Sequence, residues 1–245
     1  MDLTGPERML ADMAHVLDNP VYASLSSSQH AHLVRSRGRA LRYLNEVSPF
    51  MGLPDSPSAQ DWADACELLD AESAAVVHGP TAFPPSVEVV DQFGVLQMTA
   101  SPGAEGTEDP RAAHLSSADV PEMLDLAGRT APGPFFTRTI DLGAYVGVRK
   151  EGELIAMAGE RMVAQGWVEI SAVCTSPEHQ GKGLGSGLIR TLTARITRRG
   201  ARPYLHVAAS NTNAINLYKH LGFAIRRELT VSVLRRSDGT ASDSR

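Results

Sequence analysis

The chain has little cysteine, little lysine and no long apolar run. Its two cysteines, Cys66 and Cys174, stand alone and far apart in the sequence, so they form neither a disulfide framework nor a metal-ligand pair, and no metal is implied. No stretch approaches the roughly 18 consecutive apolar residues that a membrane-spanning helix needs. Residues 1–7 lack a basic region followed by an apolar one, so we expect no export signal. Together these absences predict a protein of the reducing cytoplasm.

The balance of charge argues against another class of function. The net charge is −5, and lysine occurs only at Lys150, Lys182 and Lys219, so a broad electrostatic contact with nucleic acid is not expected. A content of 42% hydrophobic and 21% charged residues is typical of a globular protein. With 245 residues the chain can bury a substantial core and form one large domain or two modest ones.

The first hundred residues show helix and strand patterns without a motif that carries chemistry. A helical pattern of apolar residues begins near Met9 and is expected to stop at Asn19-Pro20. Asp61 is placed to cap a short helix. Separate strands are expected at residues 74–77, 86–90 and 94–98.

A linker is expected at residues 101–110, which are small, acidic, rich in glycine and proline, and without periodicity. We place a domain boundary there; the alternative is a long loop inside one domain. The expected organisation is an N-terminal α/β region over residues 1–109, a second domain over 110–236 and a disordered tail over 237–245.

The second half has a more regular pattern. Residues 144–149, 154–162 and 167–175 predict three strands joined by tight turns, hence an antiparallel meander. They are followed by a helix from Gly183, a strand over 203–208, a helix over 211–221 and further strands over 223–234. This mixture of strands and helices predicts an α/β (α+β) fold.

The junction between the third of these strands and its helix is the first candidate site. Gln180-Gly181-Lys182-Gly183-Leu184-Gly185 is a glycine-rich turn, and glycine lets the backbone adopt positive φ and approach a ligand closely. The first N–H groups of the helix that follows have no intrahelical partner, so they favour a phosphate. The turn matches neither the P-loop nor the Rossmann fingerprint, and by itself it predicts only an anion site.

A second motif, Asn211-x-x-Ala214-x-x-x-Tyr218-x-x-x-Gly222-Phe223, lies one strand further on. Together with Val173-x-Thr175-x-Pro177 and Gln180-x-x-Gly183-x-Gly185, it closely resembles the GNAT superfamily of acyl-CoA-dependent N-acyltransferases, over roughly residues 110–236. The resemblance implies a mixed, mostly antiparallel sheet that is splayed between its fourth and fifth strands, with acetyl-CoA as co-substrate in the gap. Residues 1–100 lie outside it. They are expected either to contribute to the acceptor site or to be a diverged relative of the same fold.

The resemblance and the chemistry of the turn agree on the residues that hold acetyl-CoA. The main chain of Val173, Cys174 and Thr175 is expected to pair with the pantetheine arm as an added strand would, and an N–H there to polarise the thioester carbonyl. Asn211 is expected to reach the arm from the opposite side of the gap. The pyrophosphate is expected at the turn formed by Gln180, Gly181, Lys182, Gly183, Leu184, Gly185 and Ser186.

The expected chemistry is attack of an amine on a thioester. A base is useful, because deprotonating a lysine-like amine at pH 7 costs roughly 4–5 kcal/mol. Glu169 is the candidate base, since it lies four residues before Val173 and so on the same face of a regular strand. Glu160 on the neighbouring strand is its rival, and water alone is the third alternative. Tyr218 is the candidate acid for the leaving thiolate.

Two further side chains are expected to be structural. His206 points from a strand into an apolar setting, which favours a core histidine, and Cys174 is expected to lie on the face opposite Glu169, buried rather than nucleophilic. We therefore expect transfer of an acetyl group to a primary amine by direct attack in a ternary complex, by a monomer or homodimer. Two alternatives stay open: a non-catalytic acyl-CoA-binding sensor or scaffold, and a protein lysine or N-terminal acetyltransferase.

Overall fold

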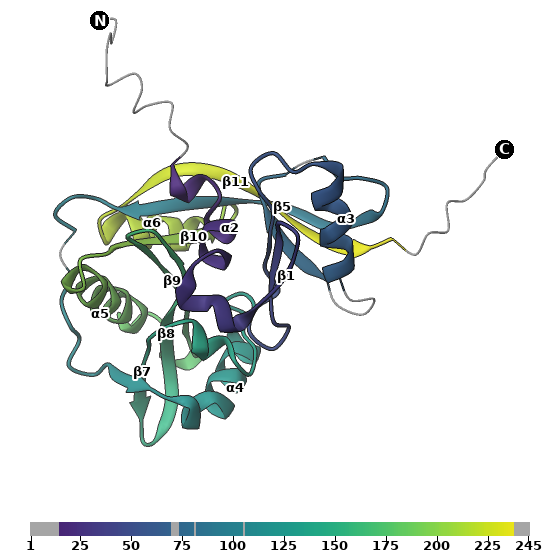
Figure 1. The fold of residues 1–245 in the computed structure, drawn as a ribbon. Coiled ribbons are helices and arrows are strands. Elements are labelled where there is room, and N and C mark those ends of the chain that lie inside the picture. Colours follow the sequence, from purple (N-terminus) through teal and green to yellow (C-terminus); the bar gives the residue numbers. More distant parts are fainter. Residues whose placement is uncertain (1–14, 70–73, 81, 105, 238–245) are drawn as a thin grey trace, which may run out of the picture.

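Most of the chain forms one large sheet with helices on both faces (Figure 1). A computed structural model describes residues 15–69, 74–80, 82–104 and 106–237. The expected mixed, mostly antiparallel sheet is confirmed: among its described neighbours only β9 and β10 run parallel. In spatial order its eight strands are β4 (Ala75–His78), β11 (Phe223–Arg236), β5 (Val87–Ala100), β10 (Arg202–Ala208), β9 (Trp167–Thr175), β8 (Glu153–Ala164), β7 (Tyr145–Lys150) and β6 (Ala113–Leu115).

The two faces of this sheet are covered by different helices. α5 (Leu184–Arg198) lies on one face, where its fully buried stripe of Leu188, Leu192 and Ile196 shares a core with α6 (Thr212–His220). α4 (Val120–Thr130) and α2 (Pro20–Leu25) contribute to separate cores that lie against other sheet residues. No helix of the described segments is long and apolar enough to cross a membrane.

The N-terminal region adds a three-stranded sheet and short helices. The helical turn η1 ends at Asp18 with Asn19 as its C-cap, in agreement with the expected stop at Asn19-Pro20. A new helix follows directly, because the Asn19 side chain accepts a hydrogen bond from the Tyr22 amide and Pro20 opens α2. Asp61 is the third residue of its helix, and Ser58 is the cap. The helical pattern near Met9 lies outside the described residues. The elements are η1 (Val16–Asp18), α2, η2 (Ser28–Leu33), β1 (Val34–Arg37), β2 (Ala40–Tyr43), β3 (Met51–Gly52) and α3 (Ala59–Leu68).

Two strands of this region, β4 and β5, belong to the large sheet. The strands expected at 86–90 and 94–98 are a single strand, β5, which pairs along its length with β11. Its other edge pairs with β10, so strands from before and after residues 101–110 alternate in one sheet. This arrangement agrees with the alternative to a domain boundary, in which residues 101–110 are a long loop that connects strands of the same sheet. The division of the chain into independent domains stays a prediction.

The segment after β5 is held against α5. Glu108 forms ion pairs with Arg195 and Arg198, and the Asp109 amide donates to the Thr191 hydroxyl. The chain then passes through β6, η3 (Ser117–Asp119), α4 and η4 (Thr139–Leu142) into β7. The further strands expected over residues 223–234 are the single strand β11.

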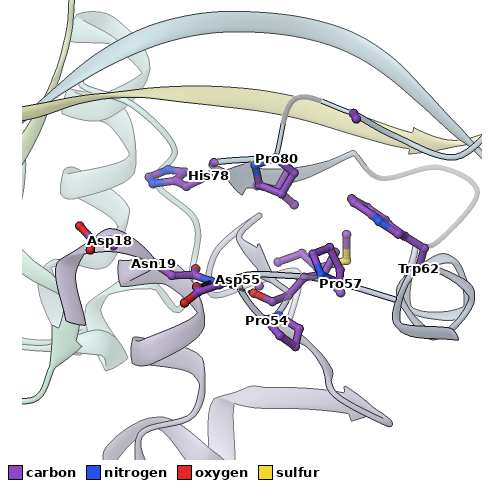
Figure 2. A pocket seen from close by; sticks show the side chains of 14 residues that line it. Asp18, Asn19, Pro54, Asp55, Pro57, Trp62, His78 and Pro80 are labelled. Atoms are coloured by element: carbon purple, nitrogen blue, oxygen red, sulfur yellow. Dashed lines mark hydrogen bonds between the residues drawn. The ribbon is translucent and has the colours of Figure 1, made fainter. Parts of the chain in front are cut away.

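A pocket of about 650 Å³ lies in the N-terminal region, between β4, the segment after β3 and α3 (Figure 2). It is separate from the pocket at the glycine turn, with which it shares no lining residue.

Candidate active site

The large sheet opens between β9 and β10. Their pairing covers Arg202–Tyr204 against Trp167–Glu169 and does not continue toward Thr175. On its other edge β9 stays paired with β8 as far as Thr175. The edge of β9 that faces the gap therefore has no partner strand over its last residues, and its main chain is free to bond an extended ligand.

The glycine turn lies where this gap reaches the start of α5. Gly181 and Gly183 both have φ of +73°, a backbone conformation that residues other than glycine rarely adopt. Gly183 is the N-cap residue of α5, and no side chain caps the helix there. A pocket of about 390 Å³ opens at this point, lined by Thr175, His179, Gln180, Gly181, Gly183, Leu184, Gly185, Ser186 and Leu217. The turn thus combines space with the positive end of a helix, which suits a phosphate.

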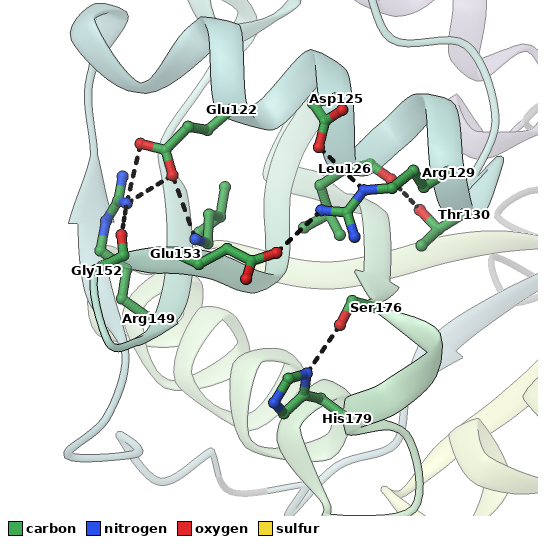
Figure 3. Close-up of polar contacts among 11 residues, drawn as sticks. Glu122, Asp125, Leu126, Arg129, Thr130, Arg149, Gly152, Glu153, Ser176 and His179 are labelled. Carbon is green, nitrogen blue, oxygen red and sulfur yellow. Dashed lines mark hydrogen bonds and ion pairs between the residues drawn. The ribbon is translucent and has the colours of Figure 1, made fainter.

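Side-chain hydrogen bonds stabilise the segment that leads into the turn. η5 (Pro177–His179) leads into it, and the Ser176 hydroxyl lies 3.0 Å from Nδ1 of His179 (Figure 3). Nε2 of the Gln180 side chain donates to the Thr175 carbonyl at 3.4 Å. His179 and Leu217 line the pocket but have no role in the sequence motif. Leu217 directly precedes the motif residue Tyr218 on the helix. In the sequence, this position is the only indication that Leu217 lies near the site.

Four of the expected cofactor residues lie outside this lining. Nζ of Lys182 donates to the Glu178 carbonyl at 3.0 Å. Asn211 caps α6, its side chain accepting from the Ala214 amide. Val173 and Cys174 lie on β9, where their main chain borders the gap. Contact of all four with a cofactor stays a prediction.

A β-bulge changes which residues of β9 share a face. Ala172 has φ of +52°, and the register with β8 slips by one residue there. An extra residue reverses the alternation of side chains, so Val173 packs with Ile170 in the core under α5, whereas Cys174 packs in the core under α4. The expectations that Glu169 shares a face with Val173 and lies opposite Cys174 are therefore wrong.

Glu169 is fully buried at the point where the two strands part. Arg161 of β8 donates a hydrogen bond of 2.7 Å to each carboxylate oxygen, and Nδ1 of His206 lies 2.7 Å from Oε1. Burial raises the pKa of this carboxyl group, but the charge and hydrogen bonds of Arg161, with those of His206, lower it to about 2. Such a carboxylate is a weak proton acceptor. Its role as the base stays a prediction that this geometry does not favour.

The second ring nitrogen of His206 is fixed as well. Nε2 lies 3.1 Å from Nε2 of Gln97, and Oε1 of Gln97 accepts from Arg226. The Gln97 amide is therefore the donor, which assigns the imidazole proton to Nδ1, facing Glu169. Arg226 in turn donates to Asp18 at 2.6 Å. A continuous polar network thus runs from η1 through the sheet to Glu169. The side chain of His206 is buried, as expected, but its setting is polar and not apolar.

Glu160, the rival base, is held by another arginine. It is buried, and Nη2 of Arg199 at the end of α5 donates to it at 2.6 Å. Glu160 is thus paired with Arg199 and not with the adjacent Arg161.

Tyr218 lies half-buried on α6, with its ring edge to face against Phe223 at 6.3 Å between centroids. Burial raises the pKa of its hydroxyl to about 12, so the group is protonated at neutral pH. No hydrogen bond of this hydroxyl occurs among the described residues, which leaves it able to donate to a ligand. Its role as the acid stays a prediction.

Comparisons with known proteins agree with this geometry. The family model described as FR47-like protein matches residues 145–232. A crystal structure of a GNAT-family protein from Novosphingobium aromaticivorans DSM 12444 is 38% identical, with a TM-score of 0.84, and the match covers 91% of this chain and 100% of that one. Both β9 and β10, and the glycine turn between them, lie within the family match.

Curated relatives match over shorter stretches. The uncharacterised N-acetyltransferase YobR of Bacillus subtilis (strain 168) is 36% identical over 73 residues, 29% of this chain and 30% of that protein. The N-alpha-acetyltransferase RimI of Mycobacterium tuberculosis (strain ATCC 25618 / H37Rv) is 34% identical over 82 residues, 32% of this chain and 51% of that protein. The matched stretch thus spans about a third of the length of YobR and about half of the length of RimI.

Proposed function

Because this chain belongs to the GNAT family of acetyltransferases, we propose that it transfers an acetyl group from acetyl-CoA to a primary amine in a ternary complex. The observation that carries the proposal is the glycine turn at the start of α5, which opens onto the unpaired edge of β9. Amides of Leu184, Gly185 and Ser186 are placed to bind the pyrophosphate, and the main chain of Val173–Thr175 to bind the pantetheine arm. An N–H of this edge polarises the thioester carbonyl.

Direct attack by the amine is supported by the state of the cysteines. Cys66 and Cys174 are both buried, and burial raises the pKa of the Cys174 thiol. Neither side chain is therefore exposed to accept the acetyl group first. The amine nitrogen forms its bond to the acetyl carbon, the carbon–sulfur bond breaks, and the Tyr218 hydroxyl donates to the departing thiolate.

The amine must lose a proton, and we assign its removal to water in the open part of the gap. Glu169 is fully engaged with Arg161 and His206, so we assign it a positioning role at the point where β9 and β10 part. This replaces direct proton transfer to Glu169, and it predicts that the reaction rate rises with pH as the free amine becomes more abundant.

The test measures thiol release from acetyl-CoA with a panel of small amines. We expect saturation by both substrates, and initial-rate lines that intersect, as a ternary complex requires. Tyr218→Phe is expected to lower kcat by about 10- to 100-fold, while Tyr22→Phe on α2 leaves it unchanged. Binding of acetyl-CoA without turnover for any amine would favour the alternative, a non-catalytic sensor or scaffold.

A second candidate acceptor is the N-terminus or a lysine of a protein. It is supported by the 34% identity to an N-alpha-acetyltransferase over 82 residues. Peptides that begin with alanine, compared with the small amines in the same assay, separate the two acceptors. We place either reaction in the cytoplasm, on the basis of the unpaired cysteines.

A further inference from the structure

The pocket beside β4 has the size and walls of a ligand site. Its volume of about 650 Å³ lies within the range of roughly 300–1,000 Å³ that small-molecule pockets occupy. Its walls carry both apolar and polar surface, and the indole of Trp62 stands at one end (Figure 2). The walls come from Met51, Leu53, Pro54, Pro57, Trp62 and Val77.

His78 forms the inner wall of this pocket. The residue lines the pocket at the end away from Trp62 (Figure 2) and is only 8% exposed. Its Nδ1 is buried and has no hydrogen-bond partner within the described part of the chain. Burial lowers the pKa of the imidazole, so the ring is neutral and offers one donor and one acceptor. Because this atom has no accessible surface, a molecule in the pocket contacts the exposed edge of the His78 ring and not Nδ1.

The charge of the lining favours a cation. Its described residues include two carboxylates, Asp18 and Asp55, and neither lysine nor arginine. Asp18 is already paired with Arg226 and Arg227. Asp55 is exposed and accepts a hydrogen bond of 2.8 Å from the Asn19 side-chain amide. A carboxylate across the pocket from an indole ring suits an ammonium group attached to an apolar body.

The inner wall of the pocket touches the network at the parting of β9 and β10. The His78 ring packs edge to face against His206 at 5.1 Å and against Phe50 at 5.3 Å. His206 is bonded to Glu169, and Arg161 lies over the Phe50 ring at 4.7 Å. A molecule in contact with the His78 ring is thus separated from Glu169 by the His206 side chain alone.

We propose that this pocket is a second binding site, apart from the glycine turn, for a small organic amine with an apolar body. Its ammonium group lies at Asp55 and its apolar part faces Trp62, with the His78 ring as the inner wall of the site. The chemistry is the same whether the amine is the acetyl acceptor or a separate effector of the gap.

The first test is direct binding, measured by calorimetry on the full chain without acetyl-CoA. The probes are phenethylamine and its neutral analogue 2-phenylethanol. We expect phenethylamine to bind at least tenfold more tightly. Asp55→Asn removes this difference, and Trp62→Phe weakens phenethylamine binding severalfold. Asp91→Asn, an exposed carboxylate on β5, is the matched control and leaves both affinities unchanged.

The absence of saturable phenethylamine binding, or equal binding by wild type and Asp55→Asn, overturns the proposal. Because no acetyl-CoA is present, this result is independent of the proposed acetyl transfer. Mass spectrometry after addition of acetyl-CoA then separates the two sources. Acetylated phenethylamine with a raised KM in Asp55→Asn identifies the acceptor. Unmodified phenethylamine that shifts the Kd of CoA identifies an effector.

Discussion

At the scale of single residues, the buried pair of Glu169 and Arg161 ties the parting of β9 and β10 to the stability of the whole protein. Both carboxylate oxygens are bonded, and the side chain is inaccessible to solvent. Removing one partner of a buried pair leaves an uncompensated charge, which is far more costly than losing an exposed pair. We therefore expect Glu169 to act first on folding, and on catalysis only by holding β9 and β10 at the point where they part.

We expect Glu169→Gln to lower the free energy of unfolding at pH 7 by about 3–5 kcal/mol. The folded carboxyl group has a pKa of about 2, below the value of about 4.3 for an unfolded glutamate. Because the folded pKa is depressed, the pair contributes fully above pH 4.3 and less as the pH falls toward 2. Urea unfolding of wild type and variant should therefore converge over this range.

Glu153→Gln is the control, since Glu153 forms an exposed pair with Arg129 (Figure 3) and should change stability by less than about 1 kcal/mol. A Glu169→Gln variant with wild-type stability and no turnover would contradict the positioning role. It would support Glu169 as the base.

The residues that the sequence identified correctly are those whose role is local. Thr175, Gln180 and Gly183 line the pocket because a strand end, a glycine turn and a helix start are determined by neighbours in the chain. His78 and Gln97 were missed. Their contacts with His206 join strands that lie more than a hundred residues apart, and no spacing in the sequence indicates such a contact.

At the scale of elements, the start of α5 is the part whose geometry depends most on residue type. Gly183 has φ of +73°, and a Cβ added there would meet no atom within 4 Å. We therefore expect Gly183→Ala to destabilise the protein by about 1–2 kcal/mol through backbone conformation alone. Its methyl group would border the pocket, so CoA affinity, measured by calorimetry, should fall as well.

Gly128→Ala is the matched control for this substitution. Gly128 lies inside α4, has no positive φ, and a Cβ there also meets open space. We expect it to stabilise the protein by about 0.5–1 kcal/mol without a change in CoA affinity. Equal effects of the two substitutions on thermal unfolding would contradict a left-handed conformation at Gly183.

The bulge in β9 shows where element-level prediction stops. The bounds of this strand were predicted correctly, yet its faces were not, because Ala172 carries the positive φ without being glycine. Alanine gives no signal for such a conformation in the sequence. One inserted residue then places Glu169 and Val173 on opposite faces.

At the scale of the whole molecule, β5 explains why the two halves depend on one another. β10 and β11 do not pair with each other; both pair with β5. The composition of residues 101–110 indicated a linker, and it is a connection between β5 and the segment that crosses α5. Composition describes flexibility of a segment, but it carries no information about which strands pair on either side of it.

This arrangement predicts the outcome of cutting the connection. A protease recognition sequence inserted between Pro102 and Gly103 lies in an exposed turn, whereas Gly106 packs too closely against α5 to accept one. After cleavage we expect the two fragments to stay associated in gel filtration and to unfold in one transition, because each completes the sheet of the other. Cleavage lowers stability by the loss of one loop connection, and denaturation followed by separation should leave the C-terminal fragment unable to form its sheet alone. Two fragments that separate under native conditions, each with cooperative unfolding, would instead establish independent domains with a boundary at residues 101–110.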